Sequence, residues 1–208
     1  AVGGNIIVFS TGNNGKNVSG YPGALKDVIG VAAFAPDYLP TSYTNFGPGT
    51  NIAAPGGDYY ASPASPSTRT MILSTIPNGL SGTMPHNSNT QYGYMQGTSQ
   101  ACPHVSGVAA LGLSYAAQLR RHFKAEDFIA LMYETATPID QYMTGIKQYK
   151  RYVADLIESS PMHSMDMKDF KGGMGHGQIN AYALLKAVEG AGVEMTFPNL
   201  YVAVGGQT

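Results

Sequence analysis

The stretch GTSQACPHVSGVAAL, residues 97–111, decides how this chain folds. After an opening glycine and threonine comes Ser99, and the residues beyond it are rich in alanine, glycine and serine. Glycine inside a helix costs about 1 kcal/mol relative to alanine, so close packing against neighbouring elements has to compensate for it. Pro103 stands near the start, where a helix tolerates proline. We therefore predict a buried central helix over residues 99–119.

Other elements are predicted on both sides of this helix. Short apolar runs bounded by glycine or proline are typical of buried strands, and four of them precede it: residues 5–10, 28–34, 51–54 and 71–75. The later part of the chain is predicted to form further helices, over residues 124–136, 149–158 and 181–189. Polar and turn-forming residues without periodicity predict loops, at residues 58–69 and 78–89. Strands that precede helices favour an α/β fold in which helices cover a parallel sheet.

The composition limits the class of protein. The chain has 208 residues and a net charge of −1, with 43% hydrophobic and 12% charged residues. These values predict one globular domain and exclude a disordered, highly charged chain. They also argue against a nucleic-acid-binding protein, which normally has a basic excess. No apolar run approaches the roughly 20 residues that span a bilayer, and the single cysteine excludes an internal disulfide framework.

Ser99 is the first candidate functional residue. It is predicted to stand at the amino end of a helix, directly after a glycine turn. The free N–H groups and the positive end of the helix dipole stabilise an alkoxide or an oxyanion at such a place. A serine there is also a common helix N-cap, and capping is the more frequent role. The position by itself leaves both roles open.

The whole string around Ser99 resembles the nucleophile motif of the subtilisin-like serine proteases, the subtilases. The family pattern is Gly-Thr-Ser-x-Ala-x-Pro-His-Val-[Ala/Ser]-Gly, and residues 97–107 match every fixed position of it. The resemblance implies that Ser99 is the nucleophile of a serine endopeptidase, which hydrolyses peptide bonds through an acyl-enzyme.

A second segment, Ser10-Thr11-Gly12-Asn13-Asn14-Gly15, resembles the Ala-Ala-Gly-Asn segment of the same family. The asparagine amide of that segment donates to the oxyanion of the tetrahedral intermediate, which implies this role for Asn13. The resemblance also implies substrate binding by the three residues before it: Ser10, Thr11 and Gly12. Without Ser99, the pattern Gly-Asn-Asn-Gly is typical of a turn.

Further matches extend the resemblance over most of residues 5–188, at 20–23, 46–56, 72–75 and 175–181. The first of these implies a cis peptide bond between Tyr21 and Pro22. The fold implied is a subtilisin-like α/β fold, a parallel sheet flanked by helices, incomplete at its N-terminal side. We predict that residues 1–190 are the C-terminal portion of a catalytic domain. Residues 139–174 are then a family-variable insertion, and 191–208 an extension or the start of a following segment.

The chain departs from the family pattern in one respect. A subtilase needs an Asp and a His beside its serine, and neither an Asp-x-Gly nor a His-Gly-Thr-His string occurs here. His104 belongs to the serine motif and is structural in the family. The other histidines match no base motif: His86, His122, His163 and His176. The triad Asp and His are therefore expected in sequence upstream of this chain, and the chain alone is expected to be inactive.

The cysteine, the methionines, a group of His and Asp residues and the tyrosines could each have a structural or a functional role. Cys102 is expected to be packed and unreactive. The methionines of the 139–174 segment are expected to supply flexible apolar packing. His163, Asp166 and Asp169 are close enough in sequence for a metal site, but a polar loop explains them as well. The tyrosines near the serine motif, at 59, 60, 92 and 94, either line a substrate groove or are half-buried beside it.

Two functional hypotheses follow. The first is a serine endopeptidase whose partners are a protein or peptide substrate and the missing N-terminal half of the domain. The second is a non-catalytic subtilase-like module that binds a partner or has a structural role. For the first, the resemblance implies no required cofactor, calcium as an optional structural ion with unknown ligands, and an extracellular or periplasmic location. Neither nucleic acid nor a membrane is expected as a partner.

Overall fold

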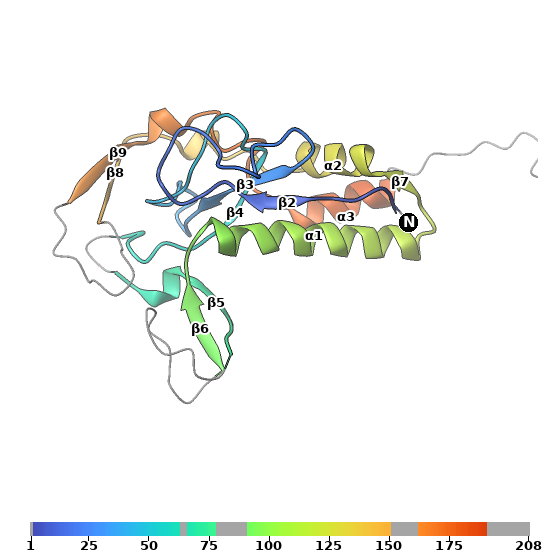
Figure 1. The fold of residues 1–208 in the computed structure, drawn as a ribbon, viewed down its shortest axis with the longest axis horizontal. Coiled ribbons are helices and arrows are strands. Elements are labelled where there is room, and N and C mark those ends of the chain that lie inside the picture. Colours follow the sequence, from blue (N-terminus) through green and yellow to red (C-terminus); the bar gives the residue numbers. More distant parts are fainter. Residues whose placement is uncertain (1, 63–65, 78–90, 151–161, 191–208) are drawn as a thin grey trace, which may run out of the picture.

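The computed structural model describes residues 2–62, 66–77, 91–150 and 162–190 (Figure 1). The α-helices are α1 (Thr98–Gln118), α2 (Ala125–Glu134) and α3 (Ala181–Gly190). The strands are β1 (Val2–Gly3), β2 (Val8–Ser10), β3 (Ile29–Phe34), β4 (Ile52–Pro55), β5 (Ile72–Thr75), β6 (Tyr92–Met95), β7 (Phe123–Lys124), β8 (Ile146–Tyr149) and β9 (His163–Asp166). The described residues also form the short 3-10 helices η1 (Thr68–Thr70), η2 (Asp140–Tyr142) and η3 (Met167–Phe170).

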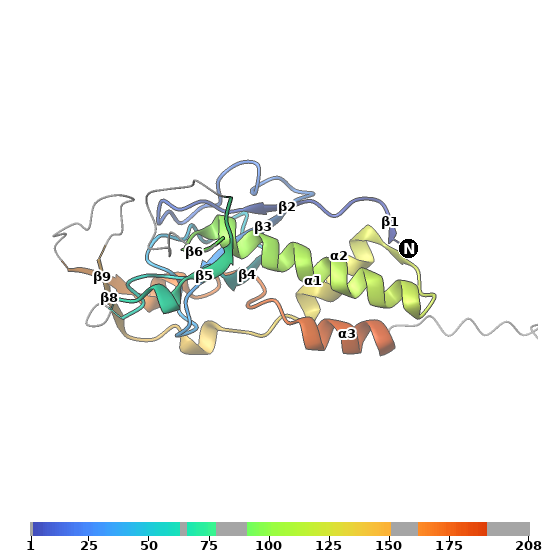
Figure 2. The same ribbon diagram turned by 90° about the horizontal axis from the view of Figure 1, so that it is seen from below.

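A parallel sheet of three strands, in the order β2-β3-β4, forms the centre of the fold. Every residue of β3 is buried, which is what an apolar strand covered on both faces requires. Both views of the ribbon place α1, α2 and α3 at one end and the β8–β9 hairpin at the other (Figures 1 and 2). The predicted α/β fold is confirmed.

The helices cover one face of this sheet. Side chains spaced by four along α1, from Ala101 through Val105 to Ala109, are buried and pack in one cluster with β3 and β4. Gly112 lets α1 approach closely, because an added methyl group would lie 2.9 Å from the Phe128 ring of α2 and 3.0 Å from Leu184 of α3. The small residues of the motif segment therefore serve close packing, as predicted.

The 139–174 segment covers the opposite face. Ala32 and Phe34 of β3 point to this side and pack with a cluster that includes five buried residues of the segment, Ile139, Met143, Met167, Phe170 and Met174. The rings of Phe46 and Phe170 lie 4.1 Å apart in the same layer. The packing role predicted for the methionines is found at these positions.

Two predictions of burial were wrong. The helix predicted to be buried on all sides exposes one face among the described residues, where Leu111 is 48% exposed. The first strand was predicted to be buried, yet Ile7 is 45% and Phe9 is 42% exposed. Ile6 and Val8 pack against the helical cluster, whereas Ile7 and Phe9 alternate to the other face of the strand, which the described layer of the 139–174 segment does not cover. Apolar composition indicates a strand or helix but does not show which of its faces is covered.

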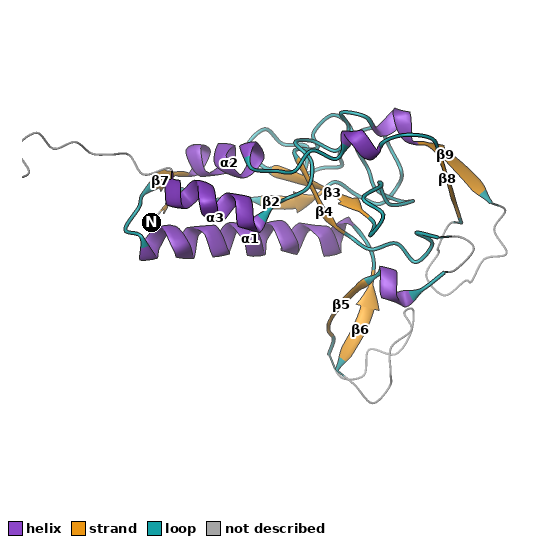
Figure 3. Ribbon diagram, turned by 180° about the vertical axis from the view of Figure 1, so that it is seen from behind, coloured by secondary structure: helices purple, strands orange, loops and turns teal. Residues whose placement is uncertain are grey.

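Two antiparallel hairpins were not predicted as such. The run at 71–75 does form β5, but β5 pairs with β6 outside the parallel sheet, with Ile72 opposite Met95. This hairpin projects from the body beside the start of α1 (Figure 3). A helix was predicted from residue 149, whereas Tyr149 ends β8, which pairs with β9. The rest of that prediction, the loop at 78–89 and the extension 191–208 lie outside the described residues.

The backbone of the family-like turn agrees with its prediction. The peptide bond between Tyr21 and Pro22 is cis. This turn precedes β3. At residues 20–23 the resemblance to the family therefore extends from the sequence to the backbone conformation.

A pair of alanine substitutions tests the packing of α1. Gly112→Ala should lower the free energy of unfolding by about 1–2 kcal/mol, because overpacking outweighs the gain in helix propensity. Gly107 is the matched control on the same helix, where nothing lies within 4 Å of an added methyl group. Gly107→Ala should raise that free energy by up to about 1 kcal/mol. Urea unfolding followed by circular dichroism measures both, and equal shifts would contradict the close contact.

Candidate active site

The local backbone presents Ser99 to solvent at the first turn of α1. The helix N-cap is Gly97, whose φ of 152° lies in the region that favours glycine, and Ser99 itself is exposed. Ser99 is therefore not the capping residue, which removes the structural alternative that its position left open. Its N–H is one of the first helix N–H groups, which have no acceptor within the helix.

The side chain of Asn13 lies against the residue before this serine. Asn13 Oδ1 accepts hydrogen bonds from the Thr98 N–H and the Thr98 hydroxyl, both at 2.8 Å. The same hydroxyl accepts a hydrogen bond from the Gly12 N–H at 3.2 Å. Because two donors occupy Oδ1, the amide has a fixed orientation in which its Nδ2 remains a donor. Asn13 is thus more than a turn residue: it supplies an acceptor to the start of α1.

Asn45 is a residue of this site that the sequence did not reveal. It is buried, and its Nδ2 donates to Thr11 O at 2.9 Å. Its Oδ1 accepts from the N–H groups of Asn14 and Lys16, each at 3.0 Å. These bonds hold the loop on both sides of Asn13. Asn45 belongs to no motif and has no characteristic spacing to other polar residues, so the sequence did not predict its role in the site.

The three residues predicted to bind substrate lie in this loop and differ in accessibility. Ser10 ends β2 opposite Val31, and Gly12 is half-buried beside Thr98. The Thr11 side chain is fully buried, with its hydroxyl within hydrogen-bond distance of carbonyl oxygens inside the fold. The Thr11 hydroxyl therefore serves the fold.

The histidine side chains described in the structure are engaged away from Ser99. His104 Nδ1 lies 2.8 Å from the Gln100 carbonyl oxygen on its own helix. The His176 ring stacks on Tyr133 at 4.6 Å, and the His163 ring stacks on Tyr149 at 5.4 Å. His122 is exposed beyond the end of α1, and His86 lies outside the described residues.

The tyrosines near the serine motif do not share one environment. Tyr60 is buried and meets Tyr59 edge to face at 5.0 Å. Tyr92 is 55% exposed on the hairpin that leads to α1. Packing therefore accounts for Tyr60, whereas Tyr92 is on the surface.

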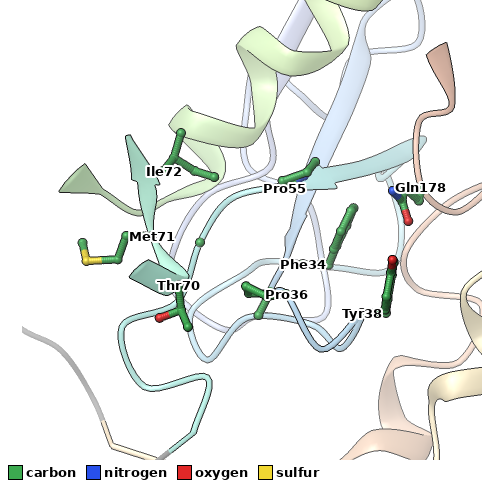
Figure 4. A pocket seen from close by; sticks show the side chains of 10 residues that line it. Phe34, Pro36, Tyr38, Pro55, Thr70, Met71, Ile72 and Gln178 are labelled. Atoms are coloured by element: carbon green, nitrogen blue, oxygen red, sulfur yellow. The ribbon is translucent and has the colours of Figure 1, made fainter. Parts of the chain in front are cut away.

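A cavity of about 240 Å³ opens at the carboxyl ends of β3 and β4. Figure 4 shows Phe34, Tyr38 and Pro55 on one side of it and Met71 and Ile72 on another. Aromatic, proline and methionine side chains suit an apolar group rather than an ion.

No metal centre emerges from the described part of the chain. It holds no group of three His, Cys, Asp or Glu side chains able to ligate an ion. Asp166 instead accepts from the Lys168 N–H at 3.0 Å and caps η3. In place of the polar loop considered for this segment, the structure has the strand β9 followed by η3. No described helix combines the length and apolar character that crossing a membrane requires.

Known proteins match this chain. The sequence model of the Subtilase family matches residues 2–178. The extracellular basic protease of Dichelobacter nodosus is 32% identical over 135 residues, which are 64% of this chain and 20% of that protein. The extracellular protease of Xanthomonas campestris pv. campestris is 39% identical over 114 residues, 54% of this chain and 17% of that protein. Proteins named intracellular serine proteases also match.

Solved structures match as well. The crystal structure of a lanthipeptide protease has a TM-score of 0.63 and 26% sequence identity to this chain. The match covers 87% of this chain and 50% of that one. The chain therefore spans half of this solved structure and about a fifth of the two curated relatives.

The environment of Cys102 makes a prediction about its reactivity. The side chain is half-buried on α1, and burial raises the pKa of its thiol. Because the thiolate is the reactive form, iodoacetamide at pH 8 should label it at least about tenfold more slowly in the folded chain than in the unfolded one. The control is Ser106→Cys in a Cys102→Ala background, since Ser106 is exposed one turn further on. Similar rates at both positions would refute the burial effect.

Proposed function

The chain belongs to the subtilase family, and on this premise we propose that it is the part of a serine endopeptidase that carries the nucleophile, Ser99. The observation that carries the proposal is the contact of Asn13 with Thr98, at 2.8 Å and 85 positions apart in the sequence. It brings the predicted oxyanion donor beside the residue that precedes the predicted nucleophile.

The proposed reaction is acyl transfer. The Ser99 oxygen attacks the carbonyl carbon of a peptide bond while a histidine takes its proton. The oxyanion that forms accepts hydrogen bonds from Asn13 Nδ2 and the Ser99 N–H. Collapse of this intermediate breaks the C–N bond, and the histidine returns the proton to the leaving amine. Water then hydrolyses the acyl-enzyme.

The proton acceptor and its orienting carboxylate are proposed to come from sequence outside these 208 residues. Serine hydroxyl is a weak nucleophile at neutral pH and needs a base within about 2.6–3.2 Å. The engagement of His104, His163 and His176 elsewhere supports this view. The alternative, a module that binds without catalysis, gives no chemical reason for an exposed serine at the position of the family nucleophile.

The substrate is proposed to be a protein or peptide, and the location extracellular or periplasmic. The names of the two curated relatives described above support the extracellular location. Fractionation of the source cells with an antibody against this chain tests it. Recovery from the cytosol alone would reverse the assignment.

Labelling with a fluorophosphonate tests the division of the triad. The isolated chain should react no faster than an ordinary serine peptide, because its nucleophile lacks a base. Mixing it with the segment that carries the Asp and His should give labelling at a protease-like rate and hydrolysis of a general peptide substrate. Ser99→Ala should abolish both. Rapid labelling of the isolated chain would show that the base lies within it.

Asn13→Leu tests the oxyanion donor in the assembled enzyme. We expect kcat to fall about 10²–10³-fold with little change in KM, a magnitude taken from subtilisin itself. The reason is that the donor acts on the charge that develops in the transition state. Asn17→Leu is a control, since Asn17 is exposed. Unchanged kcat in Asn13→Leu would remove this residue from the mechanism.

A further inference from the structure

We propose that Asp58 is a positioning residue for Ser99. Its buried carboxylate holds the loop 56–60, and that loop holds the two residues, Gln96 and Gly97, that lead into α1. The inference rests on the proposed function, because it concerns the reactivity of Ser99. It involves a carboxylate that belongs to none of the family motifs.

Two hydrogen bonds fasten the loop to the turn before the nucleophile. The Gly97 N–H donates to the Gly56 carbonyl at 3.0 Å. The Tyr59 N–H donates to Gln96 Oε1 at 2.6 Å. The two backbones are also in close contact, since a methyl group on Gly56 would lie 2.9 Å from the Gly97 carbonyl oxygen. A shift of the loop is therefore transmitted to the start of α1.

Asp58 fixes the loop from inside the fold. The residue is fully buried, and its Oδ2 accepts the Ser42 N–H at 2.7 Å. Its Oδ1 lies 3.1 Å from the Tyr60 nitrogen and 3.2 Å from the Ser42 hydroxyl. The Asp58 backbone adds two bonds to Thr70, at 3.0 Å and 2.7 Å. Both carboxylate oxygens are thus used to join this loop to the 41–43 segment.

Tyr43 provides a second connection from that segment. Its hydroxyl lies 3.0 Å from the Gly56 carbonyl oxygen and also hydrogen-bonds to the Gly57 carbonyl. Burial, and after it the charge of Asp58, raises the pKa of Tyr43, so its hydroxyl stays protonated and remains a donor. The carbonyl that receives the Gly97 N–H is therefore itself held in place by Tyr43.

A buried cation from the 139–174 segment accompanies the carboxylate. Lys147 of β8 places its Nζ 3.1 Å from Asp37 Oδ2 and 3.1 Å from the Pro40 carbonyl oxygen. Burial raises the pKa of Asp58, and the charge of Lys147 opposes that rise. Lys147 thereby favours the ionised form, which accepts all the hydrogen bonds that the loop offers.

The test uses the peptidase that contains this chain together with its triad Asp and His. Asp58→Asn replaces one acceptor oxygen by a donor, and Tyr43→Phe removes only the hydroxyl. Each is expected to lower kcat by about 10–10²-fold, because a misplacement of about 1 Å costs that much. KM should stay within about twofold, and fluorophosphonate labelling of Ser99 should slow by the same factor as kcat.

Asp140→Asn is the matched control. Asp140 also accepts a backbone N–H, that of Gly172 at 3.0 Å, but it makes no contact with the loop; kcat should be unchanged. A lower melting temperature with wild-type kcat in both test variants would overturn the proposal, because their role would then be structural only. If Asp58→Asn does not fold, Tyr43→Phe decides by the same criterion. Ser99→Ala tests the proposed function separately, and full activity there would refute it whatever Asp58 does.

Discussion

The rest of the site depends on one interaction, the pair of hydrogen bonds that Thr98 donates to Asn13 Oδ1 at 2.8 Å. It joins the loop after β2 to the start of α1, and it fixes Oδ1 as the accepting end of the amide, which leaves Nδ2 as the donor. Each end has its own support. Asn45 holds the loop around Asn13, and the backbone contact at Gly56 holds the turn before Ser99. The site therefore forms only where the loop after β2 meets the start of α1, and neither segment forms it alone.

The sheet explains how this contact stays in place. β3 is buried along its whole length, between a helical layer and the layer built by the 139–174 segment. The helical layer packs closely because α1 carries small side chains, with Gly112 in contact with Phe128 and Leu184. Protein interiors packed in this way transmit small shifts rather than absorb them. The loops at the carboxyl ends of the strands are positioned by that rigidity.

The sequence predicted the parts of the fold that rest on local patterns or on a long motif. The small-residue run predicted α1, and the family-like segment at 20–23 predicted the cis bond before Pro22. It did not predict what depends on pairing between distant segments. The sequence of β5 does not indicate that this strand pairs with β6 rather than with a strand of the parallel sheet. Asn45 and Asp58 act through backbone groups of other loops, and no spacing in the sequence marks such a residue.

The buried methionines of the 139–174 segment have a consequence for how the protein is oxidised. Met143, Met167 and Met174 are almost fully shielded from solvent. A thioether becomes a polar, chiral sulfoxide when peroxide reaches it, and such a group does not fit an apolar layer. Since reagent reaches these sulfur atoms only when the layer opens, their oxidation rate reports how often it does so. Methionine oxidation in the 139–174 segment would thus measure how often this layer opens beneath β3.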